Sequence, residues 1–196
     1  MRLELAMMPE GPETEALRED VLQMERMVEE FLAFARGDAL EDPAETEVGA
    51  LVRQIVETAR RAGQPVTAGE IGTAEVPLRA QAILRALQNL VDNGLRYASH
   101  VRVGVDVTAK SVRFVVEDDG PGIPPARRDE AMKPFTRLDA ARGQNDGSGV
   151  GLGLAIAADI ARSHGGLLRL GDSADMGGLK AEIVLALYAL LGLGHP

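Results

Sequence analysis

Residues 79–98 read RAQAILRALQNLVDNGLRYA, and this stretch decides the fold. Its apolar residues recur at intervals of three and four, which predicts an amphipathic helix over about Arg79 to Ala98. The face expected to be buried consists of Ile83, Leu87, Leu90, Val91, Leu95 and Ala98. The opposite face carries Arg85, Asn89, Asp92, Asn93 and Arg96.

Two asparagines in the middle of this helix are unusual. Asn is a weak helix former because its amide competes for nearby backbone groups. Asn89 and Asn93 lie one turn apart and therefore share a face. An amide oxygen is a neutral ligand suited to a Mg²⁺ ion that also holds phosphate oxygens and water. Taken alone, however, the helix is explained better by an ordinary solvated polar face.

The flanking patterns predict a mixture of helices and strands. Upstream, we expect Thr46 to cap a helix that ends at Gly63 and buries Val48, Leu51, Val52, Ile55, Val56 and Ala59. The predicted strands cover Val66–Val76, Val101–Val107, Val112–Val116, Leu167–Leu170 and Leu179–Leu187. A further helix is expected over about Leu152 to Ser163, after a mostly irregular segment from Gly120 to Asn145. This order predicts an α+β fold, a two-layer sandwich with helices on one face of a mixed sheet.

The composition restricts the class of protein. The chain has 196 residues, of which 45% are hydrophobic and 3% aromatic, so one aliphatic core plus a small appendage is expected. The absence of Cys excludes disulfides, thiolate-bound zinc and a cysteine nucleophile, and it fits a cytoplasmic location. The net charge of −9 argues against a general nucleic-acid binder, which needs a basic face. No run of about 18 apolar residues occurs, so we expect no membrane span within the sequence.

Two glycine-containing segments add possible ligand contacts. In Val116–Ile123, an apolar strand is followed by Asp118 and then by Gly120 and Gly122. These glycines would let the backbone approach a flat ligand, although the segment also fits ordinary turn chemistry. In Gly147–Leu154, four glycines alternate directly before the helix predicted over about Leu152 to Ser163. This arrangement suits a loop that binds phosphate at a helix N-terminus. That loop lacks the Gly-Lys-Ser/Thr of a Walker motif, and a flexible hinge is its alternative explanation.

Taken together, these segments resemble the ATP-binding domain of the histidine kinase, gyrase, Hsp90 and MutL (GHKL) superfamily, most closely sensor histidine kinases of the EnvZ-like osmosensor type. Asn89–Ala98 resembles the N box, Asp118–Ile123 the first Gly box, Lys133–Arg137 the F box and Gly149–Ile156 the second Gly box. The likeness covers about Thr46 to Leu187 and implies the Bergerat-type ATP-binding fold. Residues Glu13–Arg36 resemble the second helix of the family's dimerisation hairpin, because their apolar residues follow a heptad pattern from Leu17 to Ala35.

The resemblance implies a division into four parts. Residues 1–37 would be the remnant of a dimerisation and histidine-phosphotransfer hairpin, 38–45 a linker, 46–188 the ATP-binding catalytic domain and 189–196 a C-terminal tail.

The resemblance also implies roles for individual residues, with ATP and Mg²⁺ as cofactors. Asp118 would accept a hydrogen bond from the adenine amino group, and Asn93 would ligate the Mg²⁺ that bridges the phosphates. Asn89 and Arg96 are the expected catalytic residues, and with Tyr97 they would border the phosphates and the base. The remaining expected ATP-binding residues are Gly120, Gly122, Ile123, Phe135, Arg137, Gly149, Val150, Gly151, Leu152 and Gly153. Residues Ala126 to Ser148 would form a mobile lid, with Phe135 and Arg137 as its anchor.

Departures from the family pattern bear on these expectations. Gly94 stands where the family often has Ala, which weakens the helix by up to about 1 kcal/mol but is expected to affect no contact. Ala131-Met132 replaces a common Leu-Phe pair, which leaves the packing of the lid open. ATPases of this fold resemble one another in having Glu where this chain has Asn89. Because an amide cannot accept a proton, transfer to a histidine is favoured over hydrolysis.

The family's phosphoacceptor histidine is absent from the sequence. In the family it lies in a His-(Glu/Asp)-Leu-Arg-Thr-Pro motif, and Met1–Met8 resembles the segment shortly after that motif, so we expect the acceptor upstream. His100, His164 and His195 are expected to be surface residues. The expected partners are a second copy of the full-length protein and a response regulator receiver domain, with any membrane contact made by upstream segments.

Two other functions stay open at this point. The first is a non-kinase regulator that binds nucleotide, or a phosphotransfer scaffold, and the second is a GHKL ATPase of the MutL type. The complete set of boxes argues against the first, and Asn89 together with the acidic charge argues against the second.

Overall fold

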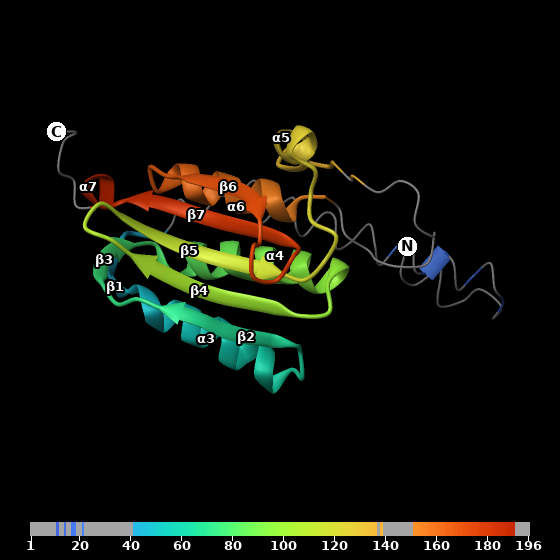
Figure 1. The fold of residues 1–196 in the computed structure, drawn as a ribbon, viewed down its shortest axis with the longest axis horizontal. Helices are drawn as coiled ribbons and strands as arrows, with labels where there is room; N and C mark the ends of the chain where they lie inside the picture. The colour runs from blue at the N-terminus through green and yellow to red at the C-terminus, as the bar shows by residue number, and fades with distance from the viewer. Residues whose placement is uncertain are drawn as a thin grey trace.

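The computed structural model describes residues 41–136, 138 and 151–190, together with Gly11, Thr14, Leu17, Arg18 and Val21 (Figure 1). The expected dimerisation helix, the expected lid from residue 139 onward, and Arg137, Gly149 and Val150 lie outside the described residues, apart from the five N-terminal positions.

A five-stranded mixed sheet forms one layer of the domain (Figure 1). Its strand order is β2-β4-β5-β7-β6, with β2 parallel to β4 and the other neighbours antiparallel. The strands are β2 Val66–Ile71, β4 Val101–Val107, β5 Ser111–Asp118, β6 Leu167–Asp172 and β7 Leu179–Ala186. A separate antiparallel pair joins β1 Ala44–Glu47 to β3 Glu75–Leu78.

Three helices cover one face of this sheet and form the second layer (Figure 1). They are α3 Val48–Arg61, α4 Ala80–Tyr97 and α6 Gly153–Ser163. The alternation in β4 turns Val101, Val103 and Val105 toward the helices, and all three are fully buried. The predicted α+β sandwich with an aliphatic core is therefore confirmed, and Phe114 is its largest fully buried side chain.

Local details differ from the sequence-based expectations. Thr46 does not cap α3; it lies in β1, and the N-cap is Glu47, whose side chain accepts a hydrogen bond from Gly49 N at 2.8 Å. The single strand expected over Val66–Val76 is two strands, β2 and β3, in different sheets. The segment expected to be irregular contains η1 Pro125–Arg127 and α5 Arg128–Ala131, and α7 Leu187–Leu190 ends the described chain. Ala131 is buried, so this small residue packs against the core.

Gly94 has a contact that was not expected from the sequence. A Cβ atom at this position would lie 2.8 Å from Cγ2 of the fully buried Val101. The glycine therefore brings α4 close to β4, in addition to lowering the intrinsic stability of the helix.

The N-terminus of α4 is held by residues outside the helix. Its N-cap residue, Arg79, makes no side-chain capping bond. Glu41 replaces the missing cap: its two carboxylate oxygens accept hydrogen bonds from Gln81 N at 3.1 Å and Ala82 N at 3.3 Å. Arg79 Nη2 in turn donates to the carbonyl and hydroxyl oxygens of Ser163 at the end of α6. An acidic side chain at this end also offsets the partial positive charge of the helix.

Replacing Glu41 with Ala should therefore destabilise the domain. We expect a loss of about 0.5–2 kcal/mol in the free energy of unfolding, the range for a lost helix cap. Urea denaturation of both proteins gives this value. The control is Glu45→Ala, which removes an exposed acid of β1 that caps no helix. Equal losses in the two variants would contradict a capping role for Glu41.

Candidate functional site

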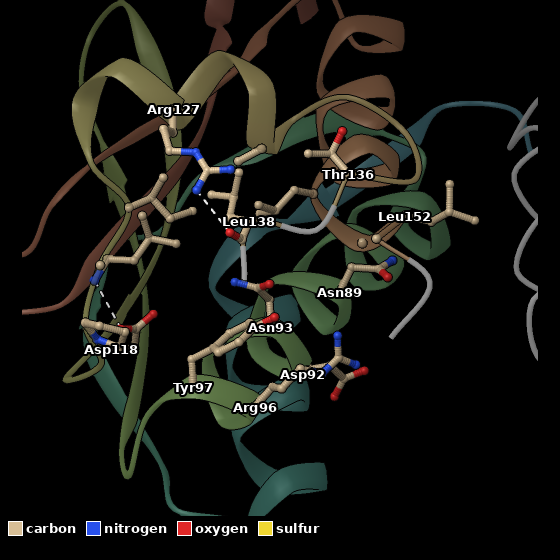
Figure 2. A pocket seen from close by; sticks show the side chains of 18 of the residues that line it. Asn89, Asp92, Asn93, Arg96, Tyr97, Asp118, Arg127, Thr136, Leu138 and Leu152 are labelled. Atoms are coloured by element: carbon tan, nitrogen blue, oxygen red, sulfur yellow. Dashed lines mark hydrogen bonds between the residues drawn. The ribbon is translucent and has the colours of Figure 1, made fainter. Parts of the chain in front are cut away.

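A cleft of about 270 Å³ opens between α4, the end of β5, the segment 121–131 and the start of α6 (Figure 2). It brings together most of the residues expected to bind a ligand: Asn89, Asn93, Arg96, Tyr97, Asp118, Gly122, Ile123, Gly151, Leu152 and Gly153. Residues 89–97 and 118–123 are far from residues 151–153 in the sequence, so the sheet topology assembles this site.

Asp118 lies at the buried end of the cleft. Its carboxylate Oδ1 accepts hydrogen bonds from Gly120 N at 2.9 Å and Leu179 N at 3.1 Å. Burial raises the pKa of Asp118 above its ordinary value; the two backbone N–H groups lower the pKa and nearby Asp119 raises it further, but burial has the largest effect. The neighbouring Asp119 is different, because hydrogen bonds from the backbone of His100 and Ser99 lower its pKa. A carboxylate kept buried with a raised pKa in a cleft is typical of a binding site.

Gly178 was not singled out from the sequence, yet the position of Asp118 depends on it. Gly178 N donates to the backbone oxygen of Asp118 at 3.0 Å. A Cβ atom at Gly178 would lie 2.4 Å from both the backbone oxygen and Oδ1 of Asp118. Only glycine therefore fits beside this carboxylate. Its signal in the sequence is the Gly177-Gly178 pair before the last strand, which also fits an ordinary turn.

The polar face of α4 forms one wall of the cleft (Figure 2). Asn89 Nδ2 donates to the backbone oxygen of Arg85 at 2.9 Å, so its amide is oriented by its own helix. A Cβ atom at Gly153 would lie 3.5 Å from Asn89 Oδ1, which places this oxygen beside the start of α6. Asn93 extends into the middle of the cleft in Figure 2, between Asn89 and Tyr97.

The start of α6 forms the opposite end of the cleft. Its N-cap residue is Leu152, and no side chain of the described residues forms a capping bond there. A helix N-terminus without a capping side chain presents free backbone N–H groups and partial positive charge, which favours an anion. Gly151 has a φ of 76°, and a Cβ atom there would lie 2.7 Å from the backbone oxygen of Thr136, so both its conformation and its packing require glycine.

Gly120 and Phe135 lie beside the cleft but do not line it. Phe135 is 60% exposed, has a φ of 62°, and its backbone N donates to Gly151 O at 3.0 Å. Its backbone therefore contacts the glycine-rich loop at Gly151, and its side chain is exposed among the described residues. The expected contact of Phe135 with the lid stays a prediction, because most of the lid lies outside the described residues. A left-handed conformation is rare for an aromatic residue and marks local strain.

Several residues line the cleft without having been expected from the sequence. They are Pro121, Pro124, Arg127, Ala131, Thr136, Leu138, Leu154 and Leu179, and Asp92 also lines it. Most come from the segment after the first Gly box, which shows no clear period in the sequence.

The cleft suits a nucleotide chemically. A buried carboxylate can accept a hydrogen bond from an amino group on a flat base, and the N-terminus of a helix can bind an anion. Within the described residues, no group of three His, Asp or Glu side chains is placed to hold a metal ion. A divalent ion here would therefore need amide oxygens such as that of Asn93 together with oxygens of the ligand.

The fold and the cleft together define a nucleotide-binding domain of the two-layer sandwich class. The family described as histidine kinase-, DNA gyrase B-, and HSP90-like ATPases matches residues 79–189, and the chain belongs to this family.

Relatives within the family include bacterial sensor proteins. The chain is 31% identical to the sensor protein RstB of Escherichia coli K12 over 190 residues, which cover 91% of this chain and 42% of RstB. It is 42% identical to the sensor histidine kinase CpxA of the same strain over 108 residues, which cover 55% of this chain and 23% of CpxA. The chain thus spans less than half the length of these two relatives.

Solved structures show the same fold. The histidine kinase domain of the E. coli osmosensor EnvZ is 33% identical, with a TM-score of 0.56 over 74% of this chain and 89% of that chain. The mycobacterial sensor histidine kinase MprB is 28% identical, with a TM-score of 0.60 over 74% and 97% of the two chains. In the described part of the chain, no helix is both long and apolar enough to cross a membrane.

The raised pKa of Asp118 predicts a stabilising mutation. Because the folded state binds the Asp118 proton more tightly than the unfolded state, this group's contribution to stability falls as pH rises through about 4 and then through the raised folded-state pKa. Asp118→Asn retains an oxygen acceptor for the two backbone donors and removes the buried charge. We therefore expect it to be at least as stable as the wild type at pH 7, with the difference shrinking toward pH 4, as measured by urea denaturation.

The control is Asp119→Asn, for which the opposite trend is expected. The lowered pKa of Asp119 means that its ionised form stabilises the fold above its ordinary pKa, and that this contribution is lost as pH falls. Asp119→Asn should therefore be destabilising at pH 7 and lose its effect at low pH. The same pH trend in both variants would contradict the environments described for these two carboxylates.

Proposed function

We propose that this chain is the ATP-binding catalytic part of a two-component sensor histidine kinase. It transfers the γ-phosphate of Mg-ATP to a histidine for relay to an aspartate of a response regulator. The observation that carries the proposal is the cleft in which Asn89 and Asn93 of α4 lie between buried Asp118 and the start of α6. Relatives named as sensor histidine kinases support it.

In this proposal, the base binds at Asp118 and the phosphates extend toward Gly153. Asp118 Oδ1 is occupied by Gly120 N and Leu179 N, which orients the carboxylate and lets its second oxygen accept from the exocyclic amine of adenine. Tyr97 and Arg96 border the base and the phosphates. Asn93 would hold Mg²⁺ through its amide oxygen, and the ion would neutralise part of the phosphate charge.

The side chains in the cleft favour phosphoryl transfer over hydrolysis. Asn89 occupies the position beside Gly153, and an amide cannot remove a proton from water. Among the described residues, the carboxylates that line the cleft are those of Asp92 and Asp118. Asp92 accepts a hydrogen bond from Gln88 Nε2 at 2.8 Å, and Asp118 accepts from two backbone groups. Phosphoryl transfer needs mainly positioning and charge neutralisation, which this site can supply.

The acceptor is proposed to be a histidine of a helical hairpin rather than His100 or His164. His164 is engaged through both ring nitrogens: Nδ1 with Ile160 O at 2.8 Å and Nε2 with Arg79 N at 3.3 Å. His100 lies near Asp119, with 3.4 Å between Nδ1 and the carboxylate oxygen. His195 lies outside the described residues. The proposed partners are a second copy of the full-length protein and a response regulator receiver domain.

The role of Asn93 is tested by Asn93→Ala. We expect Mg-ATP to bind at least tenfold more weakly, because a metal ligand is lost, while the affinity for adenosine changes little. Isothermal titration calorimetry with both ligands measures this difference. Gln81→Ala, which removes an exposed side chain in the first turn of the same helix, is the control for changes in helix stability. Equal losses for Mg-ATP and adenosine would show that Asn93 has only a structural role.

The proposed activity is tested by phosphoryl transfer in trans. Radiolabelled ATP is incubated with this chain alone and then with a helical hairpin of a related kinase that carries the acceptor histidine. We expect acid-labile label on the hairpin and none on this chain, and Asn93→Ala should abolish the labelling. Label on this chain would make one of its own histidines the acceptor, and no label on the hairpin would favour a nucleotide-binding regulator without kinase activity.

A further inference from the structure

Arg127 is a charged residue of the cleft that lies in none of the four boxes and was not among the expected ATP-binding residues. The sequence placed it only in the expected lid, Ala126 to Ser148. Arg127 ends the short helix η1, directly after the segment that follows β5. Figure 2 shows its guanidinium extending into the cleft from the side opposite α4, above Leu138 and Asn93. The next residue, Arg128, does not line the cleft; it donates to Ile123 O and Asp172 Oδ1 instead.

Two hydrogen bonds hold this guanidinium in place. Nε donates to Glu130 Oε2 at 3.2 Å, and Nη1 donates to the backbone oxygen of Leu138 at 3.0 Å. Arginine has five N–H donors in a planar fork, so these bonds leave most of them unused. Nη2 has no hydrogen-bond partner among the described residues, and the side chain remains 42% exposed. A fixed guanidinium with free donors at the edge of a cleft is prepared to bind an oxyanion.

The charge of the cleft supports the same conclusion. Among the described residues, the negatively charged side chains that line the cleft are Asp92 and Asp118, and the positively charged ones are Arg96 and Arg127. Without Arg127 the lining would be net negative, in a chain whose formal charge is −9. Mg-ATP is itself an anion, and the glycine-rich loop contains no Walker lysine to meet it. Among the described residues that line the cleft, Arg96 and Arg127 are the two cations, and Arg127 is also paired with Glu130 through Nε.

We propose that Arg127 binds a phosphate oxygen of the nucleotide through Nη2 while Nη1 keeps its bond to the Leu138 carbonyl. This inference rests on the proposed binding of Mg-ATP and adds a cation to that site from the wall opposite α4. The bond to Leu138 allows a purely structural alternative, in which Arg127 only fixes the cleft wall formed by Thr136 and Leu138. The two roles differ in the ligand dependence of their loss, because only phosphate binding distinguishes ATP from adenosine.

The test compares Arg127→Gln and Arg127→Lys with the wild type in calorimetric titrations of Mg-ATP, Mg-ADP and adenosine. We expect Arg127→Gln to weaken Mg-ATP and Mg-ADP about tenfold or more, the range for a lost charged hydrogen bond, and to change adenosine binding less than about twofold. Arg127→Lys should recover part of the affinity because it keeps the charge. The difference between wild type and Arg127→Gln should also shrink at high salt.

Two controls isolate the effect. Arg162→Gln removes one positive charge from the exposed end of α6, away from the cleft, and should leave all three affinities unchanged. Glu130→Gln removes the ion pair of Nε but leaves the Leu138 bond, and should keep most of the Mg-ATP affinity.

Equal losses for adenosine and Mg-ATP in Arg127→Gln, or no loss at all, would overturn the phosphate role of Arg127. If the wild type bound adenosine but not Mg-ATP, the proposed kinase function would fail together with this inference. Normal Mg-ATP binding by both the wild type and Arg127→Gln would refute the inference alone.

Discussion

The burial of the Asp118 carboxylate against backbone N–H groups is the constraint on which the arrangement of the site depends. Asp118 lies where the end of β5, the turn before β7 and the end of α4 meet, and each of these approaches it through a glycine. Gly120 N donates to its Oδ1, Gly178 N donates to its backbone oxygen, and a Cβ atom on Gly94 would lie 3.6 Å from its Cβ. The direction of its pKa shift shows that burial outweighs the two backbone donors. The fold therefore bears the cost of an acid that its own hydrogen bonds do not fully compensate, which is typical of a residue kept for function.

The contrast with Asp119 shows that the balance between burial and backbone hydrogen bonds differs between adjacent residues. The two acids are adjacent in the sequence, but the strand directs the first toward the helices and the second toward the Ser99-His100 backbone. One pKa is raised and the other lowered. Two identical side chains thus have opposite effects on the pH dependence of stability, and only the first faces the cleft.

Periodicity explains why much of the fold was predictable from the sequence, and close backbone contacts explain why the rest was not. Steps of three and four identified α4 and its polar face, and alternation identified β4, because both patterns report which side chains are buried. The cap of α3 was misassigned because Thr46 belongs to β1. Its partner strand is β3, which the sequence analysis had predicted as part of the same strand as β2. The need for glycine at 94 depends on the packing of the helix against Val101 in the next strand, and the need for glycine at 178 depends on Asp118, which is distant in the sequence. The same holds for Arg127, whose partner Leu138 lies in a segment without a clear period.

Both ends of α4 interact with other parts of the domain. Its first turn is capped by Glu41 and linked to the end of α6 through Arg79, whereas its later turns carry Asn89, Asn93 and Tyr97 into the cleft whose other end is the start of α6. The two helices are thus joined at one end by hydrogen bonds and separated at the other by the cleft. A phosphate between Asn93 and the start of α6 would meet groups whose positions are set by the whole length of both helices rather than by a flexible loop. Because phosphoryl transfer relies on positioning and on neutralising charge, a pair of joined helices with amides on one and backbone donors on the other provides what the proposed reaction requires.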